Sequence, residues 1–109
     1  MESQRFEIYR GREVDGKLVY LRLCGYAYQT EGEPHYRISL LMFPNSVYFM
    51  SKNEVAGYTI FSKASVGEDG AVKCQNPVGF ARVLDHIRTH LYVRFPDLSS
   101  HMYMSLFPN

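Results

Sequence analysis

The chain of 109 residues has no tryptophan and only two cysteines, Cys24 and Cys74. Two cysteines are too few for the disulfide framework of a small secreted protein, so we expect both thiols to be reduced. The chain lacks an apolar run of the ~18 residues that a membrane-spanning helix needs. Its first residues, MESQRFEIYR, lack the apolar stretch of a signal peptide. We therefore expect a soluble, cytoplasmic protein.

An excess of one charge and recognisable catalytic motifs are also missing. The chain has 12 Lys and Arg residues and 11 Asp and Glu residues, which gives a formal net charge of +1. No glycine-rich phosphate loop opens a helix, and no Cys and His spacing matches a zinc site. We therefore expect no enzyme activity, no cofactor and no metal. At this length, residues 1–109 are expected to form a single domain.

Aromatic side chains are plentiful, with nine Tyr and seven Phe residues. Together with Val, Ile and Leu they form short segments in which apolar and polar residues alternate, separated by clusters of turn-forming residues. This pattern predicts antiparallel strands that are joined by short loops. The predicted strands cover residues 4–10, 17–28, 35–43, 46–52 and 57–64, with 71–74 as a sixth.

The last third of the chain predicts a helix. Asn76 followed by Pro77 is typical of a helix start, and Pro96 is typical of a stop. Between them, five apolar residues lie along one helical stripe: Phe80, Val83, Leu84, Ile87 and Leu91. We therefore expect an α+β fold: an antiparallel five- to six-stranded meander with one α-helix, over about residues 77–95, packed on one face.

Hairpins that close symmetrically about the predicted turns place one apolar set beneath the helix. The predicted core set is Phe6, Ile8, Val19, Leu21, Leu23, Ala27, Tyr36, Ile38, Leu40, Met42, Val47, Phe49, Tyr58 and Ile60. A sheet covered on one side normally exposes polar residues on the other. Here the other face instead combines aromatic rings with cations, while most acidic residues fall in turns. Tyr26 is expected to lie opposite Arg37 as a cation–π pair.

Ten residues of this second face are our candidate binding residues: Tyr20, Arg22, Tyr26, Tyr28, His35, Arg37, Tyr48, Lys52, Phe61 and Lys63. Half-exposed, the seven aromatic rings of this face offer roughly 500–900 Å² of surface; they are Tyr9, Tyr20, Tyr26, Tyr28, Phe43, Tyr48 and Phe61. The largest apolar patch on a typical monomer covers about 300–600 Å². The excess predicts that something covers this face.

Three occupants fit this face. The chain can cover it with its own tail, residues 98–107, of which 100–107 also alternate like a final strand. Single-stranded DNA or RNA can stack its bases on the rings and place phosphates on the cations. A protein can dock there, either a second copy in a homodimer or a larger complex that the chain inhibits or adapts, because Tyr and Arg are enriched at interface hot spots.

Two further groups contain side chains that can bind a metal ion or act as a nucleophile: the pair His86 and His90, and Cys24. His86 and His90 are four residues apart and would share a helix face, but a zinc site needs a third ligand, so we interpret them as a solvated or phosphate-facing pair. Cys24 shares the second face with His35 in the predicted register. The two lie about two residue pairs apart, which is too far for a Cys/His dyad.

Overall fold

The computed structural model describes residues 3–30, 32–53, 57–98 and 100–108, and the side chain of Tyr20 lies outside this description. Residues 31 and 54–56 of two predicted turns also lie outside it. The strands are β1 (Ser3–Val14), β2 (Lys17–Thr30), β3 (His35–Leu40), β4 (Tyr48–Lys52), β5 (Gly57–Val66), β6 (Val72–Val83), β7 (His90–Arg94) and β8 (Met102–Ser105). Each strand pairs antiparallel with the next.

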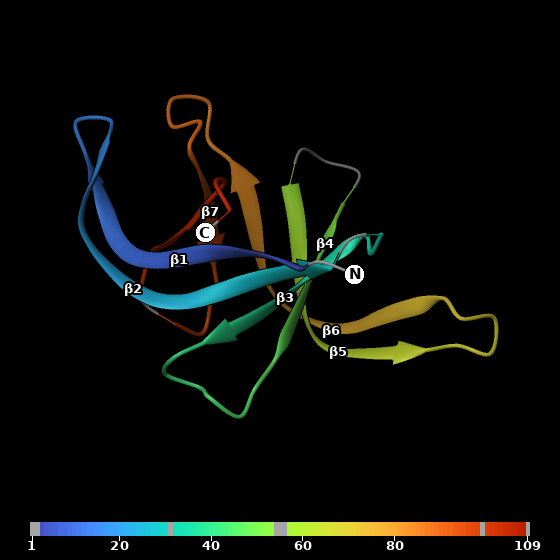
Figure 1. The fold of residues 1–109 in the computed structure, drawn as a ribbon. Coiled ribbons are helices and arrows are strands. Elements are labelled where there is room, and N and C mark those ends of the chain that lie inside the picture. Colours follow the sequence, from blue (N-terminus) through green and yellow to red (C-terminus); the bar gives the residue numbers. More distant parts are fainter. Residues whose placement is uncertain (1–2, 31, 54–56, 99, 109) are drawn as a thin grey trace.

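The sheet closes into a barrel because β8 pairs with two strands at once (Figure 1). On one side Met104 lies opposite Ile8 of β1, and on the other it lies opposite Leu91 of β7. The predicted last strand is thus confirmed as β8. Closure satisfies the main-chain groups that an open sheet would leave at its two edges.

The barrel interior is filled by side chains, as is usual when about eight strands close. Among the described residues, nine large side chains are almost completely buried: Ile8, Ile38, Leu40, Met50, Ile60, Leu91, Val93, Met102 and Met104. Aromatic rings close the remaining space, with Tyr36 edge-on to Phe6 at 5.8 Å and to Tyr58 at 6.0 Å between ring centroids. Burial accordingly raises the pKa of the Tyr36 hydroxyl. Among the described side chains, every buried nitrogen or oxygen has a hydrogen-bond partner.

The predicted core face is correct in its centre and wrong at its margins. Eight of the predicted residues belong to the core or pack against it: Phe6, Ile8, Ala27, Tyr36, Ile38, Leu40, Tyr58 and Ile60. Leu21, Met42 and Val47 are instead exposed. They lie where strands run past the barrel or in the loop between β3 and β4, so no neighbouring layer covers them.

The predicted α+β fold is wrong, because the described residues contain no helix and the fold is all-β. The segment predicted as a helix over 77–95 contains most of β6, a loop and β7. Asn76 adopts a positive φ of 65°, a conformation that Asn tolerates better than most residues, rather than capping a helix. Pro77 lies opposite Phe61 beside a bulge, a position where a strand tolerates proline.

Two features explain why this segment is extended: Gly79, and the edges of β5 and β8, with which the segment pairs. A Cβ atom on Gly79 would lie 2.5 Å from the carbonyl oxygen of Arg94, so the close approach of β6 and β7 requires glycine there. In a helix interior the same glycine would cost about 1 kcal/mol. As strands, β6 and β7 pair with β5 and β8, which no single helix could do.

The register of β4 differs by one residue from the prediction. The connection from β3 spans residues 41–47 and contains two successive turns, in which Phe43 N–H donates to the Leu40 carbonyl and Ser46 N–H to that of Phe43. As a result Met50 lies between Tyr36 and Ile60 inside the barrel. Phe49, predicted inside, therefore points outward.

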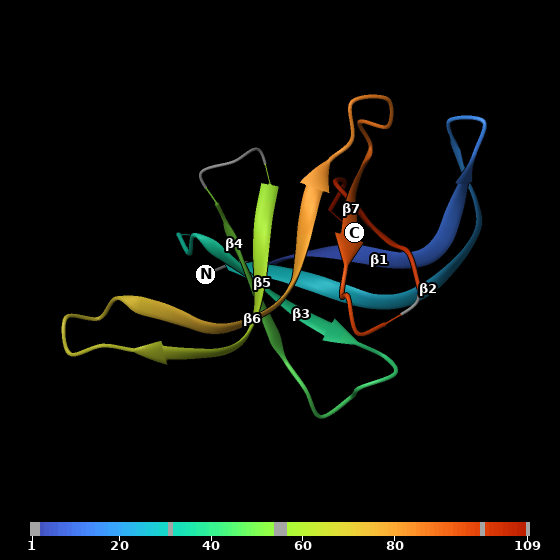
Figure 2. The ribbon, with the colours of Figure 1, turned by 180° about the vertical axis from the view of Figure 1, so that it is seen from behind.

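Two hairpins extend beyond the barrel at opposite ends, as both ribbon views show (Figures 1 and 2). One is the distal part of β1–β2 and the other is the distal part of β5–β6, and they give the molecule its long axis of 49 Å against 26 Å across. The tip of β1–β2 reaches the loop between β6 and β7, where His86 contacts the carboxylate of Glu13. The outer surface is therefore flanked by hairpins at both ends.

Two substitutions in β6 distinguish the strand from the predicted helix. Ala81 is 2% exposed inside the barrel and Val83 is 54% exposed at the end of the strand. We expect Ala81→Asp to lower the free energy of unfolding by at least about 3 kcal/mol, because it buries an unpaired charge. Val83→Asp should cost about 1 kcal/mol or less. Urea unfolding measures both, and the reverse order would support a helix whose apolar stripe contains Val83.

Candidate functional site

One line of residues on the outer surface crosses five neighbouring strands. Arg5 of β1 lies opposite Tyr28 of β2, and Tyr28 lies opposite Arg37 of β3. Arg37 lies opposite Phe49 of β4, which in turn lies opposite Phe61 of β5. Directly opposite residues have Cβ atoms about 5 Å apart on one face, so cations and rings come together here. We call these five residues the outer row.

Two hollows adjoin the outer row and share Arg37 and Val47. The first hollow, of about 470 Å³, is lined by Glu33, His35, Arg37, Val47, Phe49, Ala64, Ser65, Val66 and Val72. The second hollow, of about 320 Å³, is lined by Ser3, Tyr28, Thr30, Arg37, Ile38, Ser39 and Val47. Arg37 is exposed, and its side chain forms no ion pair or hydrogen bond with another described residue. A free guanidinium thus lies between two hollows that each have an aromatic wall.

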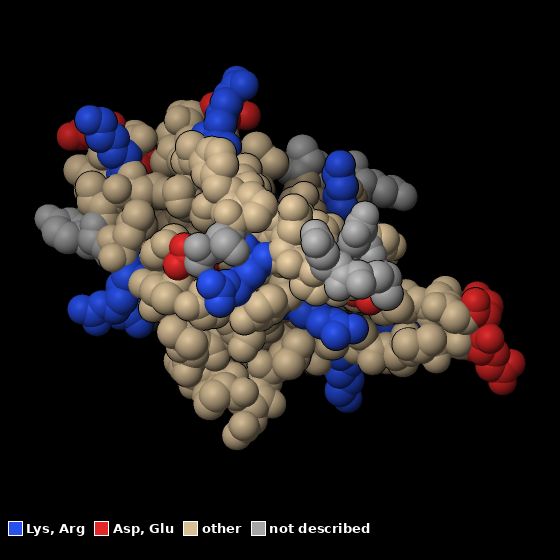
Figure 3. All heavy atoms as spheres, in the orientation of Figure 1, with Lys and Arg blue, Asp and Glu red and all other residues tan. Residues whose placement is uncertain are grey.

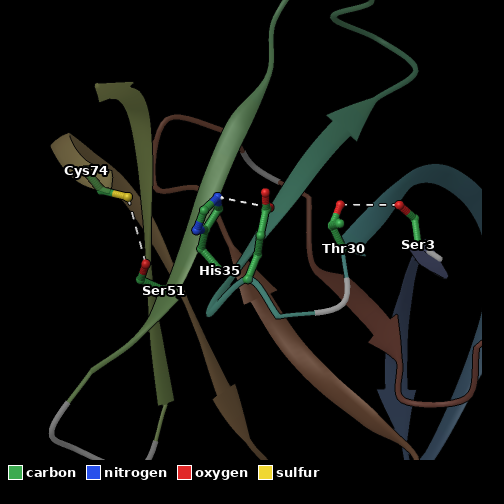
Figure 4. A network of polar contacts seen from close by, with 6 residues as sticks. Ser3, Thr30, His35, Ser51 and Cys74 are labelled. Carbon is green, nitrogen blue, oxygen red and sulfur yellow. Dashed lines mark hydrogen bonds and ion pairs between the residues drawn. The ribbon is translucent and has the colours of Figure 1, made fainter. Parts of the chain in front are cut away.

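A set of polar contacts fixes the wall of the first hollow (Figure 4). His35 is only 4% exposed, and its Nε2 lies 3.6 Å from a carboxylate oxygen of Glu33. Its ring is edge-on to Phe49, with centroids 6.3 Å apart. On the next strand, Ser51 lies opposite His35 and its hydroxyl is 3.8 Å from the sulfur of Cys74. His35 therefore supports Phe49 and Glu33 rather than projecting toward solvent.

The aromatic end of the outer row differs from the predicted pairing. Tyr28, not Tyr26, lies opposite Arg37, and Tyr26 lies opposite Ser39. The cation that Tyr26 receives is Arg5, whose guanidinium carbon is 4.8 Å from the ring centroid. The rings of Tyr26 and Tyr28 are 6.2 Å apart. Tyr28 is 38% exposed, so its ring is the more accessible of the two.

The structure brings together only part of the predicted set. Tyr28, His35 and Arg37 line the hollows, and Phe61 completes the outer row. The other candidates lie elsewhere: Tyr48 packs inside the barrel against Phe95 at 5.1 Å, Arg22 lies opposite Arg10, and exposed Lys52 and Lys63 line neither hollow. The side chain of Tyr20 is outside the described part of the chain.

The ten candidates predicted from the sequence do not include two residues of the site, Phe49 and Glu33, for different reasons. Phe49 alternates with Met50 in a segment that is apolar on both faces, so no local pattern reveals which one points outward. Glu33 lies in a predicted turn, where a carboxylate is ordinarily solvated. Its ion pair with His35 two residues later is a signal that the sequence contained, because the two side chains flank Pro34 at the start of a strand.

A second group of outer rings, on β1, β7 and β8, packs around Tyr103. Tyr103 lies between Tyr9 and Tyr92 and is 5% exposed. Burial raises the pKa values of Tyr9 and Tyr103. Tyr92 is further engaged by His101, whose Nδ1 is 2.8 Å from the Tyr92 hydroxyl. This side of the barrel is packed, so the outer row is the better candidate surface.

The predicted histidine pair does not share a face. His86 is exposed on the loop before β7 and contacts Glu13, whereas His90 lies in β7 against the ring of Tyr9 at 6.5 Å. Burial lowers the pKa of His90. Among the residues that the structure describes, no group of three or more His, Cys, Asp or Glu is arranged to hold a metal ion.

At the tip of the β5–β6 hairpin, acidic residues lie in a turn, as the sequence predicts. Acidic side chains gather at the tip of the β5–β6 hairpin, where the turn contains Glu68 and Asp69, and basic side chains lie across the barrel (Figure 3). The acidic tip lies beyond Val66 and Val72, which line the first hollow. Neither acidic residue of this turn lines either hollow.

Comparison with known proteins found no matching family model, no similar curated protein and no similar solved structure. Within the described part of the chain there is no helix that is long and apolar enough to cross a membrane. The function must therefore be inferred from the outer row and its two hollows.

Cys24 is buried inside the fold. It occupies a bulge of β2 between Leu23, opposite Tyr9, and Gly25, opposite Ile8. Burial raises the pKa of its thiol to about 11, against a smaller opposing effect of the Arg10 charge. Cys74 is also a free thiol but only half-buried.

This difference predicts selective labelling of the two thiols. A thiol with a pKa raised by two units has about a hundredfold less thiolate at pH 8 than an ordinary one. We expect iodoacetamide to modify Cys74 in the native protein and Cys24 only after unfolding, and Cys74→Ser to leave almost no native labelling. Mass spectrometry after digestion measures both. Equal native rates at both sites would show that Cys24 is accessible.

Proposed function

We propose that the chain is a non-catalytic binding module for single-stranded DNA or RNA, which binds along the outer row. The observation that carries this proposal is the row of two arginines and three aromatic rings across five strands, Arg5, Tyr28, Arg37, Phe49 and Phe61. Bases stack on exposed rings and phosphates need nearby cations, and proteins that bind single strands combine both in one groove. The two hollows provide the groove.

A protein partner is the second candidate, and three exposed valines favour it. Val47, Val66 and Val72 rim the first hollow and are 48%, 71% and 42% exposed. Apolar rims are common where proteins meet. The free Arg37 at the centre favours an anionic ligand instead, because an apolar partner would bury its charge without a counterion. A homodimer through this face would be detected as a doubled mass in light scattering.

Salt dependence tests the role of Arg37. If Arg5 and Arg37 each neutralise one phosphate, the logarithm of the binding constant for an oligonucleotide should fall against the logarithm of salt with a slope of about −1.4. Arg37→Gln should reduce the slope to about −0.7 and weaken binding. Arg22→Gln, which removes an arginine outside the outer row, should leave the slope unchanged. Fluorescence anisotropy of a labelled strand measures the slope, and equal effects of the two substitutions would contradict the proposed site.

Stacking on Tyr28 is tested separately from charge. Stacking contributes about 1–3 kcal/mol per base, so Tyr28→Ala should weaken binding of the same strand by about 5- to 150-fold. Tyr28→Phe keeps the ring and should bind within about twofold of the unchanged protein. The salt slope should stay the same in both variants. If Tyr28→Phe weakens binding as much as Tyr28→Ala, the hydroxyl rather than the ring makes the contact and the stacking role is wrong.

A further inference from the structure

The two hollows differ in chemistry, although they share Arg37. The first hollow combines the ring of Phe49 with a carboxylate, Glu33, and an apolar rim. The second combines the ring of Tyr28 with the hydroxyls of Ser3, Thr30 and Ser39. Tyr28 and Phe49 lie on strands on either side of β3, so their backbones are about 10 Å apart, twice the usual strand spacing.

From this arrangement we infer that the outer row binds two successive nucleotides, with the phosphate between them on Arg37 and one base in each hollow, and that Glu33 selects a guanine in the first hollow. This inference rests on the proposed function and adds a base preference to it. Both hollows are within the size range of small-ligand sites. The arrangement requires the two bases to be splayed apart, as they are when proteins read unpaired strands.

The presence of Glu33 in the first hollow is not explained by base stacking or by neutralisation of phosphates. A carboxylate beside a phosphate-binding arginine repels the phosphate backbone and weakens binding that does not depend on sequence. The same carboxylate is useful if a base presents hydrogen-bond donors to it. Glu33 keeps this capacity, because a carboxylate has about four acceptor positions and its side chain has one described contact, the 3.6 Å pair with His35.

Guanine is the base that matches such an acceptor best. Its pairing edge presents N1–H and the N2 amino group side by side, so it can donate two parallel hydrogen bonds to one carboxylate. Cytosine and adenine present one amino group each. Thymine and uracil present a single N3–H between two carbonyl oxygens, which a carboxylate repels. Buried His35 holds Glu33 at the edge of the hollow, so the acceptor is positioned before a base arrives.

The test compares two pentanucleotides, d(TTGTT) and d(TTTTT), by fluorescence anisotropy at low salt. We expect the unchanged protein to bind d(TTGTT) about tenfold more tightly, in the range of one two-bond base contact. Glu33→Gln should reduce this preference to within about twofold and bind d(TTTTT) at least as tightly as before. Glu68→Gln, which removes a carboxylate that lines neither hollow, should retain the tenfold preference.

The outcomes separate this inference from the proposed function. Salt-sensitive binding without a preference for d(TTGTT) overturns the guanine site and leaves single-strand binding intact. A preference that survives Glu33→Gln overturns the role of Glu33. The absence of salt-sensitive binding to either strand overturns both proposals. The comparison of the two strands on the unchanged protein decides the guanine preference even if Glu33→Gln fails to fold.

Discussion

Closure of the sheet by β8 is the constraint on which the rest of the structure depends. A four-residue strand, Met102–Ser105, pairs with β1 on one side and β7 on the other, and without it both edges of the sheet would be open. Closure defines a single interior, and Met102 and Met104 contribute to it directly. It also decides that every second residue of each strand lies outside, whatever its polarity. The aromatic outer surface is a consequence of this geometry.

The outer surface is packed on one side of the barrel and hollowed on the other. Around Tyr9, Tyr92 and Tyr103 the rings pack on one another, and the histidines near them are engaged as well. Around Tyr28 and Arg37 the chain leaves hollows instead. Of the three occupants that the sequence left open, the tail is not the one that covers the outer row, because residues 102–105 enter the sheet as β8 between β1 and β7. The free cation between two ring-walled hollows is what suggests a ligand.

The sequence predicts what local alternation determines and fails where distant pairing decides. The first five strands and the central core residues follow from period-two patterns, as in Tyr36, Ile38 and Leu40. The helix prediction failed because residues 80–91 fit helical spacing while short pieces of them also fit a strand. Pairing with β5 and β8, which lie outside this segment, selects the strand; Gly57 of β5, for example, lies opposite Arg82. Met50 and Phe49 show the same limit, since either could face inward until the length of the preceding loop is known.

The most direct test is a nuclear magnetic resonance titration of the isotope-labelled protein with a short single strand containing one guanine. If the outer row is the binding surface, the largest amide shift changes will cluster at Arg5, Tyr28, Arg37, Phe49 and Phe61 and at Glu33, while amides near Tyr92 and Tyr103 will stay in place. Changes centred on Tyr92 and Tyr103, or no changes at low salt, would contradict the assignment of the outer row as a nucleic-acid interface.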